Sequence, residues 1–118
     1  MTTLLVGIAG VAGVLSRYGI GRLSLGSEAL PWTTVAINLA GSFLLGALVA
    51  GGWFSRDARE AVGVGFLGGF TTFSTFSVQV VMDVDAGETG RAAAYLAVSV
   101  VGGLVAATAG YALGRRLA

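Results

Sequence analysis

The stretch Gly65–Ser77 holds the residues of this sequence that are best suited to chemistry. It reads GFLGGFTTFSTFS, so that hydroxyl side chains and phenylalanine rings follow two adjacent glycines, Gly68 and Gly69. Hydroxyl groups and the positive edges of aromatic rings suit an anion, whereas backbone carbonyl oxygens suit a small hard cation. The pattern therefore indicates an ion site. The alternative is a close helix crossing in which Ser and Thr bond back to their own turn.

Two phenylalanines give this stretch a defined face. Phe73 and Phe76 are three residues apart, and Ser77 follows Phe73 by four, so the three share one side of a helix. In the last apolar segment, Tyr95 and Ser99 lie one turn apart. A row of ring edges and hydroxyls suits a small, strongly hydrated anion. The same rings also fit simple packing inside a bundle or contact with lipid, and this alternative stays open.

Asn38 and Arg17 are the other polar candidates. Asn38 is the only strongly polar residue inside the second apolar segment, and Ser42 follows it on the same face. Its amide predicts either a hydrogen bond between helices or a group that faces a polar path. Arg17 ends the core of the first apolar segment, where we interpret it as a snorkelling anchor, with a buried structural role as the alternative.

Titratable groups for catalysis are missing from the apolar segments. The chain has no His and no Cys, and the central parts of these segments contain no Asp, Glu or Lys. Hydrolysis would need a base, and proton-coupled transport normally needs an ionisable group at membrane depth. We therefore expect no enzyme. All seven cationic residues are Arg and the formal net charge is +1, so no basic surface for nucleic acid is expected.

Composition predicts a membrane protein of one domain, residues 1–118. Of the 118 residues, 55% are hydrophobic and 11% are charged, against about 25% charged in soluble domains. We expect an all-α fold with a loop over residues 21–30 and four transmembrane helices at about residues 3–20, 31–54, 61–82 and 91–113. The first of these is interpreted as a membrane helix rather than a signal peptide. The third should break near Gly68–Gly69, because glycine costs about 1 kcal/mol in a helix relative to Ala.

Small residues predict close helix contacts in the first and last segments. Gly7, Gly10 and Gly13 recur near helical spacing in the first segment. In the last one a stripe at four-residue spacing contains Gly102, Ala106, Gly110 and Gly114. Such faces allow helices to approach closely in a membrane.

The distribution of arginines predicts insertion in both orientations. Four spans place Arg56, Arg59, Arg115 and Arg116 on one side of the membrane, against Arg17, Arg22 and Arg91 on the other. Orientation is normally set by a bias in such charges. The near balance gives the hypothesis that the chain pairs with itself as an antiparallel, dual-topology dimer.

Three stretches resemble the Fluc/CrcB family of fluoride channels. They are Gly65–Ser77, AINLAGSFLLG at Ala36–Gly46, and GVLSRYGIGR at Gly13–Arg22. The resemblance covers nearly the whole chain, and it implies passive fluoride export across the plasma membrane of a prokaryote. It also implies an antiparallel homodimer in membrane lipid, with two fluoride pathways.

The resemblance further implies roles for individual residues. A structural sodium ion would be held by backbone carbonyls at Gly68 and Thr71 of both chains. Phe73 and Phe76 would line each pathway, with the two rings of one pathway coming from different chains. Asn38 matches the pore asparagine and Arg17 a vestibule arginine. Polar positions associated with the pathway match Ser74, Thr75, Tyr95 and Ser99, and Ser77 joins the set through its place beside Phe73.

One departure from the family pattern keeps alternatives in view. Family members often continue the polar track of the fourth segment, where this chain has Gly103 and Ala106 or Ala107. A non-conducting subunit of a heterodimeric fluoride channel is therefore one alternative. A small dual-topology multidrug or cation exporter is another, but it would need a membrane-embedded Glu in the first segment, and residues 4–15 contain none.

Overall fold

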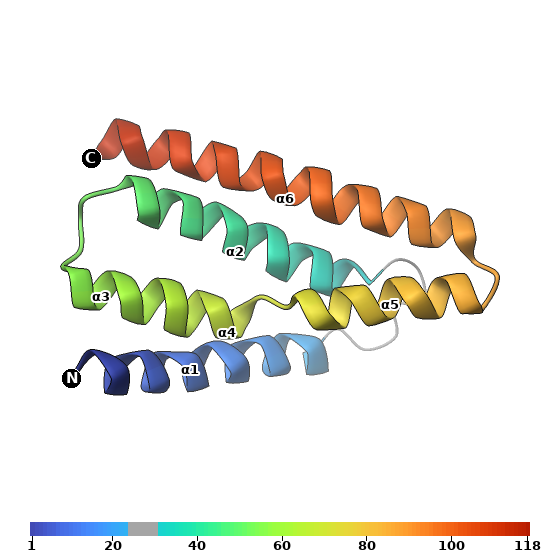
Figure 1. Ribbon diagram of the computed structural model, residues 1–118, viewed down its shortest axis with the longest axis horizontal. Helices are drawn as coiled ribbons and strands as arrows, with labels where there is room; N and C mark the ends of the chain where they lie inside the picture. The colour runs from blue at the N-terminus through green and yellow to red at the C-terminus, as the bar shows by residue number, and fades with distance from the viewer. Residues whose placement is uncertain (24–30) are drawn as a thin grey trace.

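The computed structural model describes residues 1–23 and 31–118, and within these ranges every regular element is a helix. The elements in chain order are α1 (Thr2–Leu23), α2 (Trp32–Ala50), α3 (Arg56–Glu60), η1 (Ala61–Leu67), α4 (Gly68–Phe70), α5 (Phe73–Asp85) and α6 (Thr89–Leu117). α3 to α5 follow one another as one interrupted rod (Figure 1). Among the described residues, four helical segments are long and apolar enough to cross a membrane, which confirms the four predicted spans.

The four spans run up and down. Both termini and the α2–α3 connection lie at one end of the molecule, and the α5–α6 connection lies at the other (Figure 1). α2 packs along α6, and α1 packs along η1 and α4. The loop predicted over residues 21–30 begins later than expected, because Gly21–Leu23 continue α1; residues 24–30 lie outside the described residues.

The second span is shorter than predicted. It ends at Ala50 rather than Phe54, because Gly51 turns to an extended conformation with φ −81° and ψ 152°. Trp53 then folds over Gly51, where an added Cβ would lie 2.7 Å from the indole ring. The Trp53 indole nitrogen Nε1 donates to the Leu117 carbonyl oxygen at 3.1 Å, which ties this connection to the end of α6.

Glycines set the closest helix contacts, as the small-residue stripes predicted. A Cβ at Gly13 would overlap the Phe66 carbonyl oxygen, and one at Gly110 would overlap the Phe43 carbonyl oxygen. Gly7, by contrast, has nothing within 4 Å of an added Cβ. The backbones of α1 and η1, and of α6 and α2, therefore touch only because these contact positions lack side chains.

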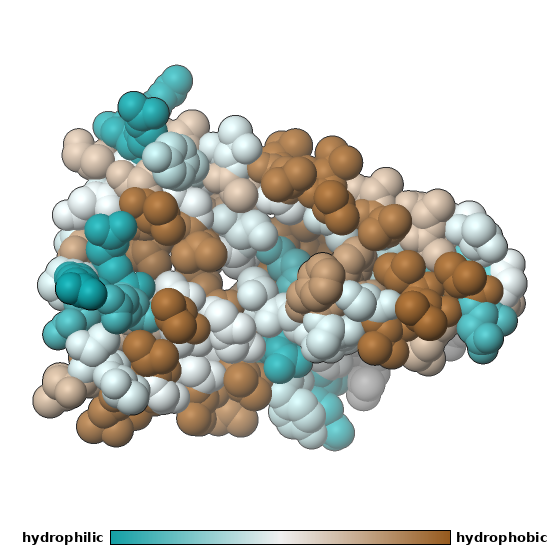
Figure 2. All heavy atoms as spheres, in the orientation of Figure 1, coloured by the Kyte–Doolittle hydropathy of each residue, from teal (hydrophilic) through white to brown (hydrophobic). Residues whose placement is uncertain are grey.

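Most large apolar side chains face outward. The buried hydrophobic cluster is small and centres on Val35, Phe76 and Tyr95. Apolar residues cover much of the face shown in Figure 2, while hydrophilic residues gather at its two ends and at one place along the lower edge. Such an exterior suits lipid rather than water.

Candidate functional site

The third span is interrupted at Thr71–Thr72, three residues beyond the predicted position. Thr71 has φ −86° and ψ 159°, and Thr72 has φ −147° and ψ 115°, so both are extended. Gly68, with φ −63° and ψ −37°, is helical. The prediction of a break at Gly68–Gly69 was therefore wrong in position. Gly69 instead permits contact with α1, since an added Cβ there would lie 2.7 Å from the Gly10 carbonyl oxygen.

Asn38 of α2 holds the break. Its Oδ1 accepts from the Thr72 backbone N–H at 2.8 Å, and its Nδ2 donates to the Thr72 carbonyl oxygen at 3.0 Å. Thr72 in turn caps α5, because its Oγ1 accepts from the Thr75 N–H at 3.2 Å. The interhelical hydrogen bond considered for Asn38 is present, and it joins side chain to backbone.

These bonds redirect two amides away from their helical acceptors. In an unbroken helix the Thr72 N–H would donate to the Gly68 carbonyl, and the Thr75 N–H to the Thr71 carbonyl. Here both amides donate to side chains instead. The Gly68 and Thr71 carbonyls therefore lose their helical donors. The carbonyls of Gly69 and Phe70 lose theirs too, because Phe73 and Ser74 begin α5, and the Gly69 carbonyl accepts from Arg17 instead. Carbonyls that lose their helical donors inside a membrane need other partners, and a cation with oxygen ligands is one such partner.

Gly68 and Thr71 face a groove of about 470 Å³ between α2, the interrupted span and α6. Six of the predicted site residues line it together: Asn38, Gly68, Thr71, Phe73, Phe76 and Ser99. The Ser99 hydroxyl is buried and has no hydrogen-bond partner among the described residues. The groove therefore gathers an amide, an unpartnered hydroxyl and two rings, together with Gly68 and Thr71, whose carbonyls lose their helical donors. Beyond Ser99, α6 lines the groove with Gly103 and Ala107, which carry no polar side chain, but Ser42 of α2 lines it near Gly103.

The two phenylalanines occupy the groove differently. Their ring centroids lie 6.0 Å apart with the planes tilted by 58°. Phe76 is 7% exposed and meets the Tyr95 ring edge-on at 5.1 Å and 89°, whereas Phe73 is 79% exposed. The Phe76 ring is thus packed against Tyr95 on its side away from the groove. Phe73 projects from the chain, where lipid or another chain can contact it.

Sequence reasoning missed Gln79. Its Oε1 accepts a hydrogen bond of 2.5 Å from the hydroxyl of fully buried Tyr95, which in turn supports the Phe76 ring. The available signal was spacing, because Gln79 follows Phe76 by three residues on the same helix face.

The remaining predicted residues lie outside this groove. Ser77 is half-buried and its Oγ donates to the Phe73 carbonyl oxygen at 2.9 Å, a bond back to its own turn. Ser74 is exposed. Tyr95 lies behind Phe76 and does not line the groove. Ser74, Ser77 and Tyr95 are therefore not brought into direct contact with the gathered polar set.

Arg17 and Thr75 line a second pocket, of about 240 Å³. The Arg17 Nε donates to the Gly69 carbonyl oxygen at 3.2 Å, so its guanidinium is half-buried against the helix that precedes the break. Arg22 and the α2 residues Thr33 and Thr34 also line this pocket, and no acidic side chain does among the described residues. Helix N-termini and guanidinium groups both favour anions. Thr72 lines both pockets.

Comparison with known proteins gives consistent matches. The family described as "CrcB-like protein, Camphor Resistance (CrcB)" matches residues 4–111. A "Fluoride-specific ion channel FluC" of Thermus thermophilus is 44% identical, with 97% of this chain and 95% of the relative covered. "Fluoride-specific ion channel FluC 1" of Bacillus cereus is 41% identical over 94% of this chain and 85% of its own length. "Fluoride-specific ion channel FluC" of Novosphingobium aromaticivorans is 41% identical over 98% of both.

Proposed function

The chain belongs to the CrcB family, a family of ion channels and not of enzymes, and we propose that it is a fluoride-selective channel that exports fluoride passively across the plasma membrane. The resemblance found in its sequence motifs is thereby confirmed at the level of the family. The chain is a multi-pass membrane protein.

The observation that carries the proposal is the composition of the 470 Å³ groove. It brings the Asn38 amide, the unpartnered Ser99 hydroxyl and the Phe73 and Phe76 rings to one surface, and it contains no charged side chain among the described residues. Hydrogen-bond donors and ring edges can replace part of the water around a small anion. The absence of a fixed positive charge in the groove lets the anion leave again, which conduction requires.

The second pocket supplies the entry that such a path needs. Arg17 and Arg22 lie there beside the N-terminal end of α2, and Thr75 lies in the first turn of α5. We propose that this pocket collects fluoride from water and delivers it past Thr72 to the groove. A membrane potential that is negative inside would then drive the anion outward, at about 2.3 kcal/mol per charge per 100 mV.

A structural sodium ion is part of the proposal. The support is the pair of carbonyls released at Gly68 and Thr71, together with the exposure of Gly68 on the groove. Two oxygens from each of two chains would give four neutral ligands, which is few for calcium and suits a monovalent ion. The ion would stabilise the pairing of the two breaks. Replacing sodium by a large organic cation should therefore lower the dimer fraction in detergent.

An antiparallel homodimer completes the proposed channel. The 79% exposed Phe73 and the open groove support a partner chain at this face, as do the near-balanced arginines. A reporter fused to the C-terminus should then be found on both sides of the membrane. A reporter found only on the cytoplasmic side would contradict self-pairing in opposite orientations.

The function is tested with purified protein in liposomes loaded with potassium fluoride. Addition of a potassium ionophore should release fluoride, measured with a fluoride electrode, while liposomes loaded with chloride should retain it. Fluoride release by this chain alone would also exclude the heterodimer alternative raised by Gly103 and Ala107. Retention of fluoride by liposomes that contain intact dimer would contradict the proposal.

A further inference from the structure

A further cavity lies at the end of the molecule that carries the two termini, next to the groove. It has a volume of about 360 Å³ and lies between the last turns of α2 and the α3–η1 segment. Its inner walls are apolar and include Leu45, Val49 and Val64. Its mouth is formed by Arg56, Arg59 and Glu60. None of the predicted fluoride or sodium residues lines it.

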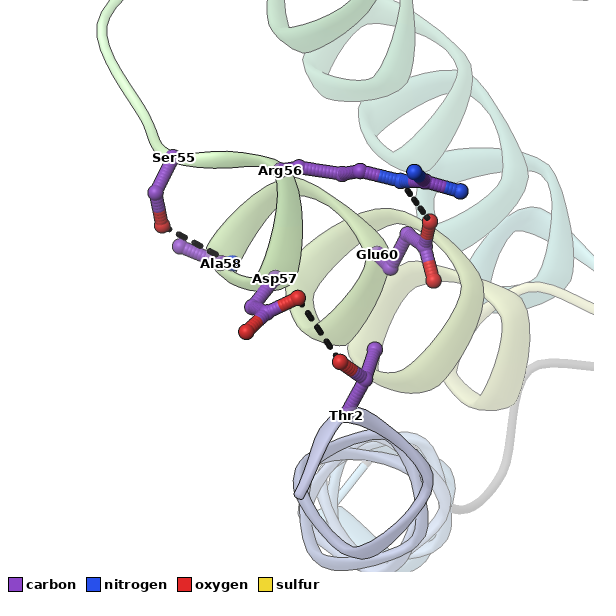
Figure 3. Close-up of polar contacts among 6 residues, drawn as sticks. All are labelled: Thr2, Ser55, Arg56, Asp57, Ala58 and Glu60. Atoms are coloured by element: carbon purple, nitrogen blue, oxygen red, sulfur yellow. Dashed lines mark hydrogen bonds and ion pairs between the residues drawn. The ribbon is translucent and has the colours of Figure 1, made fainter.

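The two sides of α3 make different contacts. Asp57 points towards α1, where its Oδ1 accepts a hydrogen bond of 2.7 Å from the Thr2 hydroxyl (Figure 3). Arg56 and Glu60 project from the side away from Thr2 and pair at 3.1 Å (Figure 3). The side that carries Asp57 holds the start of α1 against α3. The second side is the one that borders the cavity.

The guanidinium groups at the mouth keep hydrogen-bonding capacity. The side chain of Arg56 is 90% exposed although its Nε pairs with Glu60. The Nη2 of Arg59 donates to the Val49 carbonyl oxygen at 3.2 Å, which fixes Arg59 over the end of α2. A guanidinium has five N–H donors, so each of these contacts leaves others for a ligand. Two arginines against one glutamate give the mouth a net positive charge.

The apolar part of the cavity continues from the mouth towards the middle of the membrane. Val49 and Leu45 are one turn apart on α2, a rise of roughly 6 Å. Val64 is 67% exposed on the facing element, and Gly63 lets this element pack closely against α2, since an added Cβ would come within 3.3 Å of Leu48. A ligand that fits must therefore carry an anionic group at the interface and a hydrocarbon chain below it.

We propose that this cavity binds an anionic glycerophospholipid. The phosphate would contact Arg56 and Arg59, and the first part of an acyl chain would lie against Leu45, Val49 and Val64. Charge complementarity at the mouth and the apolar walls below it select this occupant. A second copy of the chain is the competing occupant, because Leu45 and Gly63 also line the neighbouring groove.

The test is a titration of delipidated, purified protein with phosphatidylglycerol and phosphatidylcholine of the same acyl chains, read by native mass spectrometry. We expect one phosphatidylglycerol per chain to bind with preference over phosphatidylcholine. Arg56→Gln with Arg59→Gln should weaken phosphatidylglycerol binding by roughly 25-fold, since each surface arginine contributes about fivefold. Arg56→Lys with Arg59→Lys, which keeps the charge, should retain most of the preference.

Arg115→Gln with Arg116→Gln is the matched control, because it removes two arginines from the same end of the molecule but not from the cavity. Val64→Phe keeps both cavity arginines and should weaken binding by filling the acyl part. The proposal would be overturned if the double variants at Arg56/Arg59 and at Arg115/Arg116 weakened phosphatidylglycerol binding equally. It would also be overturned if the unmodified protein showed no preference for phosphatidylglycerol. If Arg56→Gln with Arg59→Gln lowers the dimer fraction but leaves lipid binding unchanged, the cavity is a contact surface for a second copy of the chain instead.

Discussion

Asn38 and Thr72 exchange two hydrogen bonds, of 2.8 and 3.0 Å, across the break in the third span. The side-chain amide of Asn38 thus supplies Thr72 with both the acceptor and the donor that two separate peptide groups would supply in a continuous helix. The break is therefore stabilised by α2, because Asn38 supplies hydrogen-bond partners for the Thr72 N–H and carbonyl. This arrangement releases the Gly68 and Thr71 carbonyls and leaves them at the groove.

Asn38→Asp should weaken the break. A carboxylate still accepts from the Thr72 N–H, but it cannot donate to the Thr72 carbonyl oxygen and would face it at hydrogen-bond distance. The loss of one partner in a partly buried pair costs about 1–3 kcal/mol. We expect a lower melting temperature in detergent and strongly reduced fluoride flux. Thr108→Ala, which removes an exposed hydroxyl on α6, is the control and should change neither. A stable, fully conducting Asn38→Asp protein would show that the donated bond is dispensable.

Phe73→Ile and Phe76→Ile should both lower fluoride flux but should differ in stability. Phe76 is buried against Tyr95, so its replacement loses a ring contact of about 0.5–1.5 kcal/mol as well as packing. Phe73 is exposed in the single chain, so its replacement should leave chain stability unchanged. Phe54→Ile, at an exposed ring outside the groove, is the control for flux. Wild-type flux in both groove variants would mean that the rings only pack.

Gly13→Ala and Gly7→Ala form a matched pair within α1. The added methyl group at position 13 would overlap the Phe66 carbonyl oxygen and force α1 and η1 apart, whereas at position 7 it meets nothing. Gly13→Ala should lower the melting temperature, while Gly7→Ala should leave it unchanged or raise it, since Ala favours a helix by about 1 kcal/mol. Equal melting temperatures for the two variants would contradict the close contact at Gly13.

The sequence predicted the four spans and the small-residue contacts, because hydropathy and helical spacing report directly on burial in lipid. It also named six of the residues that line the groove. It misplaced the break, because glycine propensity pointed to Gly68–Gly69 while the tertiary bonds of Asn38 to Thr72 decided the outcome. It also missed Gln79, whose role depends on a hydrogen bond to Tyr95 in another helix. The roles of the site residues in conduction stay predictions.

Gly68→Val should act on the dimer rather than on the chain. An added Cβ at Gly68 would approach nothing closer than the Gly63 carbonyl oxygen at 3.7 Å, so the single chain accommodates it. The side chain would project beside the released carbonyls at the face where a partner is proposed. We expect a reduced dimer fraction by cross-linking and reduced flux. Thr71→Ser, which keeps the hydroxyl that donates to the Leu67 carbonyl, should be mild. A Gly68→Val protein with normal dimer fraction and flux would remove the support for a shared carbonyl site.

The most direct test of the central claim is the reversal potential of single channels in a planar bilayer, with a fluoride gradient in one direction and a chloride gradient in the other. A passive, fluoride-selective channel predicts a reversal potential that follows the fluoride gradient and does not change when a pH gradient is added. A reversal potential that follows chloride, or that shifts with the pH gradient as in a proton-coupled exporter, would contradict the account.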